Sequence, residues 1–458
     1  MRGLVCFVLI GVLFSISGCG PPNSVNPKSI DGEAIVATVG GEPIYATDFV
    51  LNYELGFPAL FGGDRTRLAY LDRIIDEKLL ALEGIRRGLL DHERIQRNIE
   101  DLREELLVEK VFQRYVNDRV NITPKDITLA MQKDRVSFRL RYLPAKSHAE
   151  AHRLRDEALK HGLAALIRDF VSKHDEQNLH PSDFESPFIR SSDLHPDLTE
   201  AIIDLPLGKI SAPVAYQGQF ILLEPIDIRR EPLTLTAATR ATYEQVAFQQ
   251  KARVLARTFI GTMMKPLDVH LKPVPYRLMR EELWRMHQEG PPPRNLLAAL
   301  WARETNDDKD LRSMLDEVLI TTSEGDWTVR DFLATFPAAR YPLRHEDRED
   351  FENDLYDAIG LTLRDHYFVR RALDEGMDED PALRHELALW TDKWVYRALR
   401  EELSNIEETI RQLRDRYPLI INHTVLDTLT LSDPNSTGLT LLKGHTLRPA
   451  FPVADPMW

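Results

Sequence analysis

Two histidines stand four residues apart, at His148 and His152, with Glu150 between them. On a helix this spacing places both rings on one face, where they can chelate a metal ion. The order differs from the His-Glu-x-x-His pattern of zinc hydrolases, and no third ligand is evident nearby. The other histidines are scattered, and no nucleophile is paired with a base. We therefore interpret the pair as an exposed helix face, and we expect neither a metal nor a cofactor.

The chain has two cysteines, Cys6 and Cys19, and both lie near its start. Arg2 precedes an almost wholly apolar run over residues 4–16. This run is too short to span a bilayer, because spanning takes roughly 20 apolar residues. The pattern is typical of a secretion signal, which we place at residues 1–18. Beyond Cys19 no cysteine remains for a disulfide or a thiolate metal site.

The sequence Ile16-Ser17-Gly18-Cys19 resembles a bacterial lipobox. The resemblance implies that a diacylglycerol is attached to Cys19, which would anchor the chain to a membrane through a flexible tether. Gly20, rather than Asp, at the second position after cleavage implies the outer membrane of a double-membrane bacterium, facing the periplasm. The alternative is an ordinary signal peptide that is cut near Gly18.

The rest of the chain has the composition of a folded protein with helical surfaces. Its 458 residues suffice for two or three domains, at about 150 residues each. It has 58 Lys and Arg against 72 Asp and Glu, which gives a net charge of −14. Nucleic-acid binding needs a concentrated basic face, so we expect no nucleic-acid partner. Charges of both signs are mixed along the chain, as on helix surfaces rather than in disordered tails.

The folded part is predicted to open with a hairpin. Ile35–Val39 is rich in β-branched residues, Gly40-Gly41 is a turn signal, and Ile44-Tyr45 returns. We expect Thr47 to cap a helix that begins at Asp48.

Amphipathic helices are predicted next. Apolar residues recur at helical spacing over residues 68–82, in a helix that ends near Gly88, and again over residues 95–115. A third, short helix is expected with Thr123 as its cap and Pro124 in its first turn.

A smaller α/β domain is predicted after these helices. Residues 136–143 indicate a strand, and residues 147–161 and 163–171 indicate two helices. The stretch from Leu194 to Glu224 then predicts a short helix, a tight turn at Leu207-Gly208, a crossing segment and a closing strand.

This last stretch resembles the C-terminal half of a parvulin-type peptidyl-prolyl isomerase domain. It keeps these residues of that pattern: Pro196, Leu205, Gly208, Ile210, Ser211, Pro213, Val214 and Gly218. The opening hairpin and its helices resemble the SurA/PrsA-type chaperones. The two resemblances imply an α+β fold, with a mostly helical SurA-like chaperone core and an inserted parvulin-like α/β domain. Apolar residues at helical spacing predict a helix over residues 236–264, and a short strand follows over residues 269–271. The resemblance implies that this helix and strand return the chain to the N-terminal core.

The parvulin resemblance also implies a site. In that family two histidines surround a central Asp or Cys, and an apolar pocket takes the proline ring. Here Tyr142 and Phe220 fall on the histidine positions, and Asp175 is the possible acid. A Tyr hydroxyl donates one hydrogen bond and Phe donates none, so we expect weak or no isomerase activity. Leu194 and Leu198 match the peptide-binding pocket, with plain core packing as the alternative.

The chain also repeats itself. Residues 318–332 mirror the opening hairpin and its helix start, residues 354–376 mirror 70–88, and residues 416–421 mirror the strand near 269. Two unrelated sets of amphipathic helices would look alike in composition, but the matched order of strand, turn, cap and helix favours duplication. We therefore expect a second, helix-rich repeat of the core that has no room for a parvulin domain.

We divide the chain into six parts on these grounds. They are a lipoprotein signal at 1–18, a tether at 19–32, the SurA-like core at 33–135 with 229–276, the parvulin-like domain at 136–228, a second core-like module at 277–430 and an irregular tail at 431–458.

These observations predict a lipid-anchored periplasmic folding factor. It would hold unfolded or extended envelope polypeptides and carry a degenerate parvulin-type domain. Two alternatives remain open. One is an active peptidyl-prolyl isomerase with a remodelled site, and the other is a non-foldase accessory subunit of an envelope complex.

Overall fold

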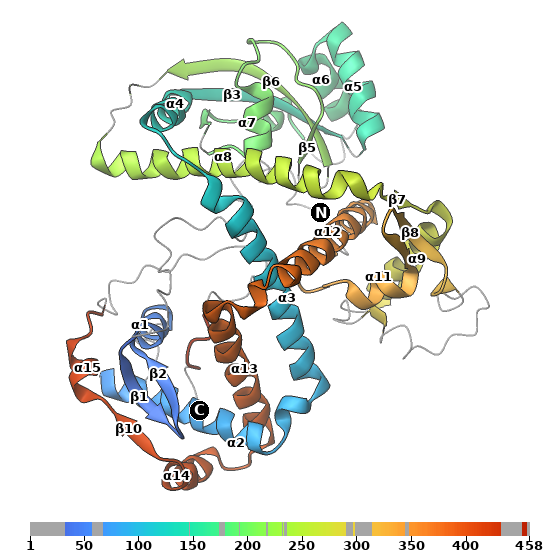
Figure 1. Cartoon of the computed structure of the whole chain (residues 1–458). Helices are drawn as coiled ribbons and strands as arrows, with labels where there is room; N and C mark the ends of the chain where they lie inside the picture. The colour runs from blue at the N-terminus through green and yellow to red at the C-terminus, as the bar shows by residue number, and fades with distance from the viewer. Residues whose placement is uncertain are drawn as a thin grey trace. The chain divides into compact units, whose positions relative to one another are not determined.

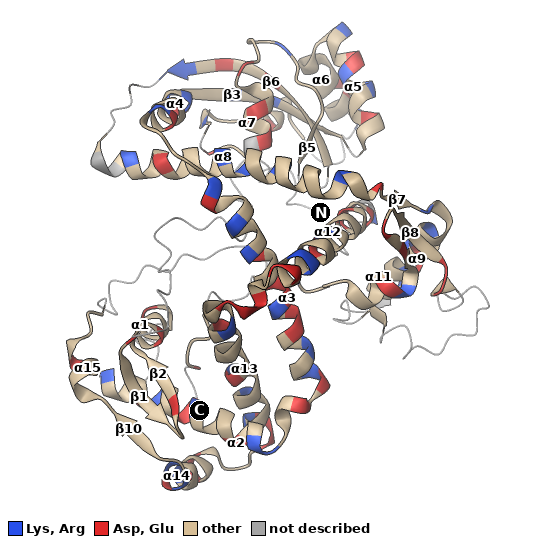
Figure 2. Cartoon of the chain, in the orientation of Figure 1, with Lys and Arg blue, Asp and Glu red and all other residues tan. Residues whose placement is uncertain are grey.

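The computed structural model describes residues 33–56, 67–145, 147–173, 179–191, 193–216, 219–230, 232, 236–289, 296–297, 314–343, 348–431 and 451–455 (Figure 1). These residues form two compact units. The terminal unit contains the described residues of 33–110 and 367–455, and the central unit contains those of 111–366. Figure 2 shows Lys and Arg interspersed with Asp and Glu along the helices of both units.

The terminal unit contains a three-stranded sheet in the order β10-β1-β2. Strands β1 (Ile35–Val39) and β2 (Glu42–Tyr45) form the predicted hairpin, and β10 (Leu419–Ile421) pairs with the other edge of β1. Both turn glycines have positive φ, 61° at Gly40 and 93° at Gly41. Two consecutive left-handed residues make the turn that suits the twist of a hairpin, and glycine adopts them without steric cost.

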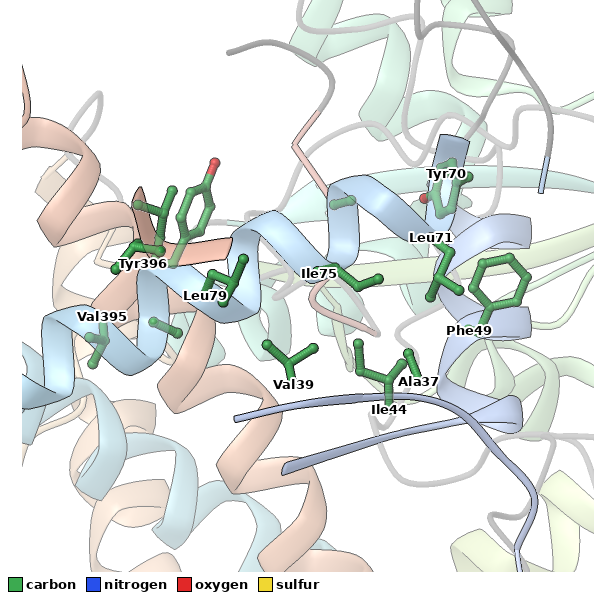
Figure 3. Close-up of a cluster of buried hydrophobic side chains, with 14 of the residues drawn as sticks. Ala37, Val39, Ile44, Phe49, Tyr70, Leu71, Ile75, Leu79, Val395 and Tyr396 are labelled. Carbon is green, nitrogen blue, oxygen red and sulfur yellow. The ribbon is translucent and has the colours of Figure 1, made fainter. Parts of the chain in front are cut away.

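Helices from both ends of the chain pack in one apolar core with this sheet. They are α1 (Ala46–Leu55), α2 (Arg67–Arg86), the start of α3 (Glu93–Tyr115), α13 (Pro381–Glu402), α14 (Ile406–Arg416) and α15 (His423–Thr428). Apolar side chains of the hairpin, α2 and α13 share one core, in which Val39, Leu79 and Val395 are fully buried (Figure 3). Helices α2 and α13 approach closely at Gly84, where a Cβ would lie 2.5 Å from Cγ1 of Val395.

The start of α1 differs from the expectation. The helix begins at Ala46 with Tyr45 as its N-cap, so the prediction that Thr47 caps a helix starting at Asp48 is wrong. Thr47 instead donates to the carboxylate of Glu33 through its backbone N–H and its hydroxyl. The cap of α4 (Pro124–Asp134) is confirmed, because Thr123 accepts from the N–H of Asp126.

The central unit contains a second hairpin that repeats the first. Strands β8 (Val318–Thr322) and β9 (Gly325–Thr328) pair in the register of β1 and β2, with an irregularity at the same place. Helices α11 (Val329–Thr335) and α12 (Arg348–Asp374) follow. Gly88 after α2 and Gly376 after α12 both have positive φ, and each leads into a 3₁₀ turn and then a long helix. The predicted fold class, with its second helix-rich repeat, is confirmed.

The two return strands pair with the hairpins of the opposite repeats. Strand β7 (His270–Leu271) pairs with β8, whereas β10, near the C-terminus, pairs with β1. The expectation that residues 269–271 return to the N-terminal core is therefore wrong. Both return strands are short and both hairpins have the same register, so local pattern does not distinguish the two pairings. The compact units consequently differ from the expected grouping of residues 33–135 with 229–276.

The inserted domain lies within the central unit. Its sheet has the order β4-β3-β6-β5 and is antiparallel throughout. The strands are β3 (Val136–Ala145), β4 (Ile189–Arg190), β5 (Val214–Tyr216) and β6 (Gln219–Arg230), and the helices are α5 (His148–His161), α6 (Leu163–Lys173) and α7 (Pro196–Ile202). The predicted strand and helices are confirmed to within two residues at each end.

Two helices flank this domain in the chain. The first, α4, packs against α8 (Ala237–Met264), where the hydroxyl of Tyr243 donates to the carboxylate of Asp134 at 3.0 Å. Strand β7 follows α8, and α9 (Pro273–Glu289) comes next. Within the described part of the chain, no helix has the length and apolar character needed to cross a membrane.

Candidate functional site

The motif that resembles parvulins has a structural role in the inserted domain. Gly208 has a φ of +72° and donates its N–H to the carbonyl of Pro225 at 2.8 Å. Ser211 donates its N–H to the carbonyl of Leu223 at 2.8 Å, and its hydroxyl accepts from the N–H of Leu223 at 3.1 Å. The crossing segment is thereby bound to β6, which explains why a turn glycine and a small hydroxyl residue stand at this spacing.

Tyr142 occupies the first histidine position of the resemblance. It lies on β3 opposite Leu223 and is 6% exposed. Its hydroxyl donates to the backbone carbonyl of Asp183 at 2.7 Å, and its ring packs against Phe184 with the ring centres 6.1 Å apart. The only donor at this position is therefore already used within the domain.

Phe220 occupies the second histidine position. It lies on β6 opposite Ala145, and the ring of His148 on α5 meets it edge to face at 5.3 Å between centres. Because side chains alternate along a strand, Phe220 and Leu223 lie on opposite faces of the sheet. Leu223 is the register partner of Tyr142, so Tyr142 and Phe220 also lie on opposite faces. The structure does not bring the two positions together.

The expected pocket residues lie in the core of the domain. Leu194 is 5% exposed and Leu198 is 1% exposed, and both pack in one cluster with Tyr142, Phe184 and Ile221. Side chains this well buried are typical of core packing. This is the alternative that the sequence left open, and burial of apolar side chains is sufficient to explain their type.

Two further predicted residues fall outside the described part of the chain. They are Asp175, the possible acid position, and Cys19, the predicted lipid attachment site.

The histidine pair lies on an exposed face of α5, as predicted. The Nε2 atoms of His148 and His152 are 3.1 Å apart, and both side chains are exposed. Among the residues that the structure describes, no group of three or more His, Cys, Asp or Glu is placed to hold a metal ion.

A polar cluster at the start of α7 was not predicted. His195 is the N-cap of this helix, and its Nδ1 accepts from the N–H of Asp197 at 3.4 Å. The ring of Tyr216 lies edge-on to it at 5.3 Å, and the carboxylate of Asp197 lies 3.4 Å from Arg253 on α8. Burial lowers the pKa of His195, although the charge of Asp197 opposes this. The cluster joins the inserted domain to α8, and the His-Pro-Asp order is the helix-start signal that indicates it.

A second unpredicted pair lies in the terminal unit. Nε2 of His385 on α13 is 2.9 Å from both carboxylate oxygens of Asp48 on α1. The hydrogen bond with Asp48 raises the pKa of His385 against the opposing effect of burial. In the second repeat the matching acid, Asp331, instead caps α11 together with Thr328. Tyr45 replaces that threonine in the first repeat and makes no side-chain cap, which leaves Asp48 to pair with His385.

No family model matches the chain, and no curated protein matches it. Several solved structures align with it. A SurA-like chaperone of Campylobacter jejuni, one of a pair that comprises the virulence factor PEB4 and the periplasmic protein Cj1289, is 17% identical with a TM-score of 0.24. That alignment covers 52% of this chain and 100% of the other.

The peptidylprolyl isomerase PrsA of Bacillus cereus is 17% identical with a TM-score of 0.22, and the alignment covers 53% of this chain and 95% of PrsA. PrsA of Bacillus anthracis is 11% identical with a TM-score of 0.20, over 43% of this chain and 95% of that one. These three solved structures are thus a SurA-like chaperone and two PrsA isomerases. TM-scores this low carry no weight for function.

Proposed function

We propose that this chain is a periplasmic folding factor that holds extended polypeptides, and that its parvulin-like domain serves binding or architecture rather than isomerisation. The observation that argues against isomerisation is the placement of Tyr142 and Phe220 on opposite faces of the β3–β6 pair. Rotation about a prolyl bond has a barrier of about 20 kcal/mol, and catalysis requires groups that act on one desolvated amide. Residues on opposite faces of a sheet cannot act on the same amide, and Phe220 has no polar side-chain atom.

Holding of clients would depend on several weak contacts. Large apolar side chains stand exposed on both units, among them Leu207 and Val254 in the central unit and Ile420 in the terminal unit, at 53%, 64% and 66%. Each alone is ordinary for a protein surface. Several weak sites on one chain bind a long unfolded polypeptide more tightly than any one of them, and such binding needs no ATP.

The experiment that tests this proposal follows the aggregation of a denatured outer-membrane protein by light scattering after dilution from urea. We expect suppression at stoichiometric amounts of the chain. Leu207→Asp together with Val254→Asp should weaken suppression by at least twofold, because charge on an apolar contact site disfavours an apolar client. Thr258→Asp is the matched control, since Thr258 is exposed on α8 one turn from Val254 and is already polar. Unchanged aggregation in the presence of the unmodified, folded chain contradicts the proposal.

Purification of the chain from cells, together with whatever it binds, distinguishes a folding factor from an accessory subunit of an envelope complex. A folding factor should capture many different envelope polypeptides in small amounts. A chain that leaves aggregation unchanged but purifies with one partner at a fixed ratio is a subunit instead.

We further propose that the chain is anchored through a lipid on Cys19 and faces the periplasm from the outer membrane. The support is the sequence Ile16-Ser17-Gly18-Cys19 followed by Gly20. Metabolic labelling with a fatty acid should mark the chain, and Cys19→Ala should abolish the label. A label that persists in this variant contradicts lipid attachment at Cys19. Recovery of the labelled chain with the inner membrane contradicts the proposed outer-membrane location.

A further inference from the structure

A short segment near the C-terminus is bound in the core of the terminal unit. Residues 451–455 form neither helix nor strand, yet they are well packed. Pro452 and Ala454 are buried, and the residues on either side of them are partly exposed. The N–H of Val453 donates to the carbonyl of Phe451 at 2.9 Å, so the segment makes a tight turn at Pro452. Ala454 is 2% exposed and belongs to the same apolar cluster as the hairpin, α2 and α13.

The backbone of this segment is held by side chains from the N-terminal part of the chain. The N–H of Ala454 donates to Oδ1 of Asn52 on α1 at 2.8 Å, and the N–H of Asp455 donates to Oε1 of Glu77 on α2 at 2.7 Å. Asn52 is buried, and the hydroxyl of Tyr70 donates to its backbone carbonyl at 2.6 Å and lies 2.9 Å from the same Oδ1. Contacts to backbone amides do not depend on the identity of the bound side chains, so they suit peptides of varied sequence.

The side chain of Asp455 supplies the specific contact. Its carboxylate lies 3.2 Å from Lys393, 2.8 Å from Arg397 and 3.6 Å from Arg400, which are spaced along one face of α13. The side chain of Lys393 is only 3% exposed and is paired with Glu77 at 2.7 Å. Burial raises the pKa of Asp455, but the hydrogen bond from Arg397 and the charge of Lys393 outweigh it and lower the pKa to about 2. An ionised carboxylate is therefore the group that this part of α13 accommodates.

We propose that α1, α2 and α13 form a binding site for a peptide with a small apolar residue followed by a carboxylate, and that residues 451–455 are its resident occupant. A client with this pattern must displace the segment before it binds. This inference rests on the proposed folding function. It states which class of peptide one site of the folding factor binds, and that residues 451–455 block this site. The segment would thus act as a built-in competitor.

The test uses the full chain and a fluorescent peptide with the sequence of residues 447–458, whose binding is followed by anisotropy. Asp455→Arg places a fourth basic side chain against Lys393, Arg397 and Arg400, so it should release the segment and leave the site open. We expect this variant to bind the peptide at least tenfold more tightly than the unmodified chain. A peptide with Arg in place of its Asp should not bind. Asp415→Arg, at an exposed position of α14, is the control with the same change of charge.

A second variant covers the possibility that Asp455→Arg disturbs folding. Ala454→Arg puts a long side chain at a buried position of the segment and leaves the basic residues of α13 and Glu77 unchanged. Circular dichroism and thermal unfolding report whether each variant is folded. If a folded Asp455→Arg or Ala454→Arg chain binds the peptide no better than the unmodified chain does, the segment is a fixed part of the fold and the proposal fails.

Peptide binding is measured without any client, so the two proposals fail separately. Tight peptide binding by the opened variants, with no suppression of aggregation by any variant, overturns the folding function but leaves the peptide site. Suppression of aggregation without peptide binding overturns the peptide site alone.

Discussion

The close approach of α2 and α13 at Gly84 can be tested by adding one methyl group. An ideal Cβ on Gly84 lies 2.5 Å from Cγ1 of Val395 and 3.3 Å from its carbonyl oxygen. Gly360, in the middle of α12, is the matched control because a Cβ there has no neighbour within 4 Å among the described residues. The comparison probes the shared core directly, since Gly84 and Val395 come from the two different repeats.

The expected sizes follow from two opposing effects. Replacing Gly by Ala inside a helix stabilises it by about 1 kcal/mol. Forcing a methyl group into a packed core costs about 1–3 kcal/mol. Val395 is fully buried and its backbone oxygen is also close, so the cost at Gly84 should lie near the upper end of that range. We expect Gly84→Ala to destabilise the chain by about 1–2 kcal/mol, and Gly360→Ala to stabilise it by about 0.5–1 kcal/mol.

Urea unfolding followed by circular dichroism measures both free energies. In the double variant Gly84→Ala with Val395→Ala, removal of the two Val395 methyl groups makes room for the new one. The double variant should therefore be less destabilised than the sum of the single variants by about 1–2 kcal/mol, within the range seen for residues in contact. If Gly84→Ala stabilises the chain as much as Gly360→Ala does, α2 and α13 do not pack as described.

Three further predictions concern other parts of the structure. The pKa of His385 is raised in the folded chain, so its contribution to stability is full below the unfolded pKa of about 6.5 and is lost as pH rises through the folded pKa. His385→Gln should remove this part of the pH dependence of the free energy of unfolding in urea. An unchanged dependence of that free energy on pH contradicts the prediction. Ser211→Ala removes the buried acceptor of a β6 amide and should cost about 1–3 kcal/mol in the same assay, whereas no loss of stability would mean that the crossing segment is held otherwise. Cysteines at Thr38 and Ile420, which are register partners in β1 and β10, should form a disulfide on oxidation, since paired strand residues have Cα atoms within disulfide reach. Cysteines at Thr38 and His270 should form no disulfide. A disulfide in that pair alone, detected on a non-reducing gel, would mean that β7 rather than β10 pairs with β1.

Local pattern was sufficient to predict most elements of the fold. The glycine pair at Gly40-Gly41 indicated the first hairpin, and the same order at 318–328 indicated the second. Apolar residues at helical spacing located α2, α3 and α8, because a helix in a layered core must bury one face. Each of these patterns is contained within one short stretch of sequence, so it does not depend on which distant residues the element contacts in the folded chain.

Features that depend on distant partners were not predictable in this way. Each of the return strands β7 and β10 could pair with either hairpin, because both hairpins have the same register. In the structure β7 pairs with β8, and β10 pairs with β1. Asp48 was expected inside a helix that Thr47 caps, but its carboxylate pairs with His385 more than 300 residues away in the chain. The binding of residues 451–455 likewise requires Glu77 and Lys393 to be close together, and no local pattern in a Pro-rich tail indicates that.

The candidate site shows the same limit. Tyr142 and Phe220, which the resemblance matches to the two histidines, lie on the paired strands β3 and β6. Which face each side chain takes depends on the register of β3 with β6, and that register separates them. Leu194 and Leu198 match a pocket by type, but apolar side chains of the same type also fill a core, and burial alone distinguishes the two.

The most direct test of the account is the rate of cis–trans isomerisation of a short proline peptide in the presence of the purified, folded chain. We expect the uncatalysed rate, with relaxation over tens of seconds, because no polar pair acts on one amide at Tyr142 and Phe220. A clear acceleration that is lost on Tyr142→Phe or Phe220→Ala, in variants that remain folded, would contradict the account and identify the chain as an active isomerase with a remodelled site.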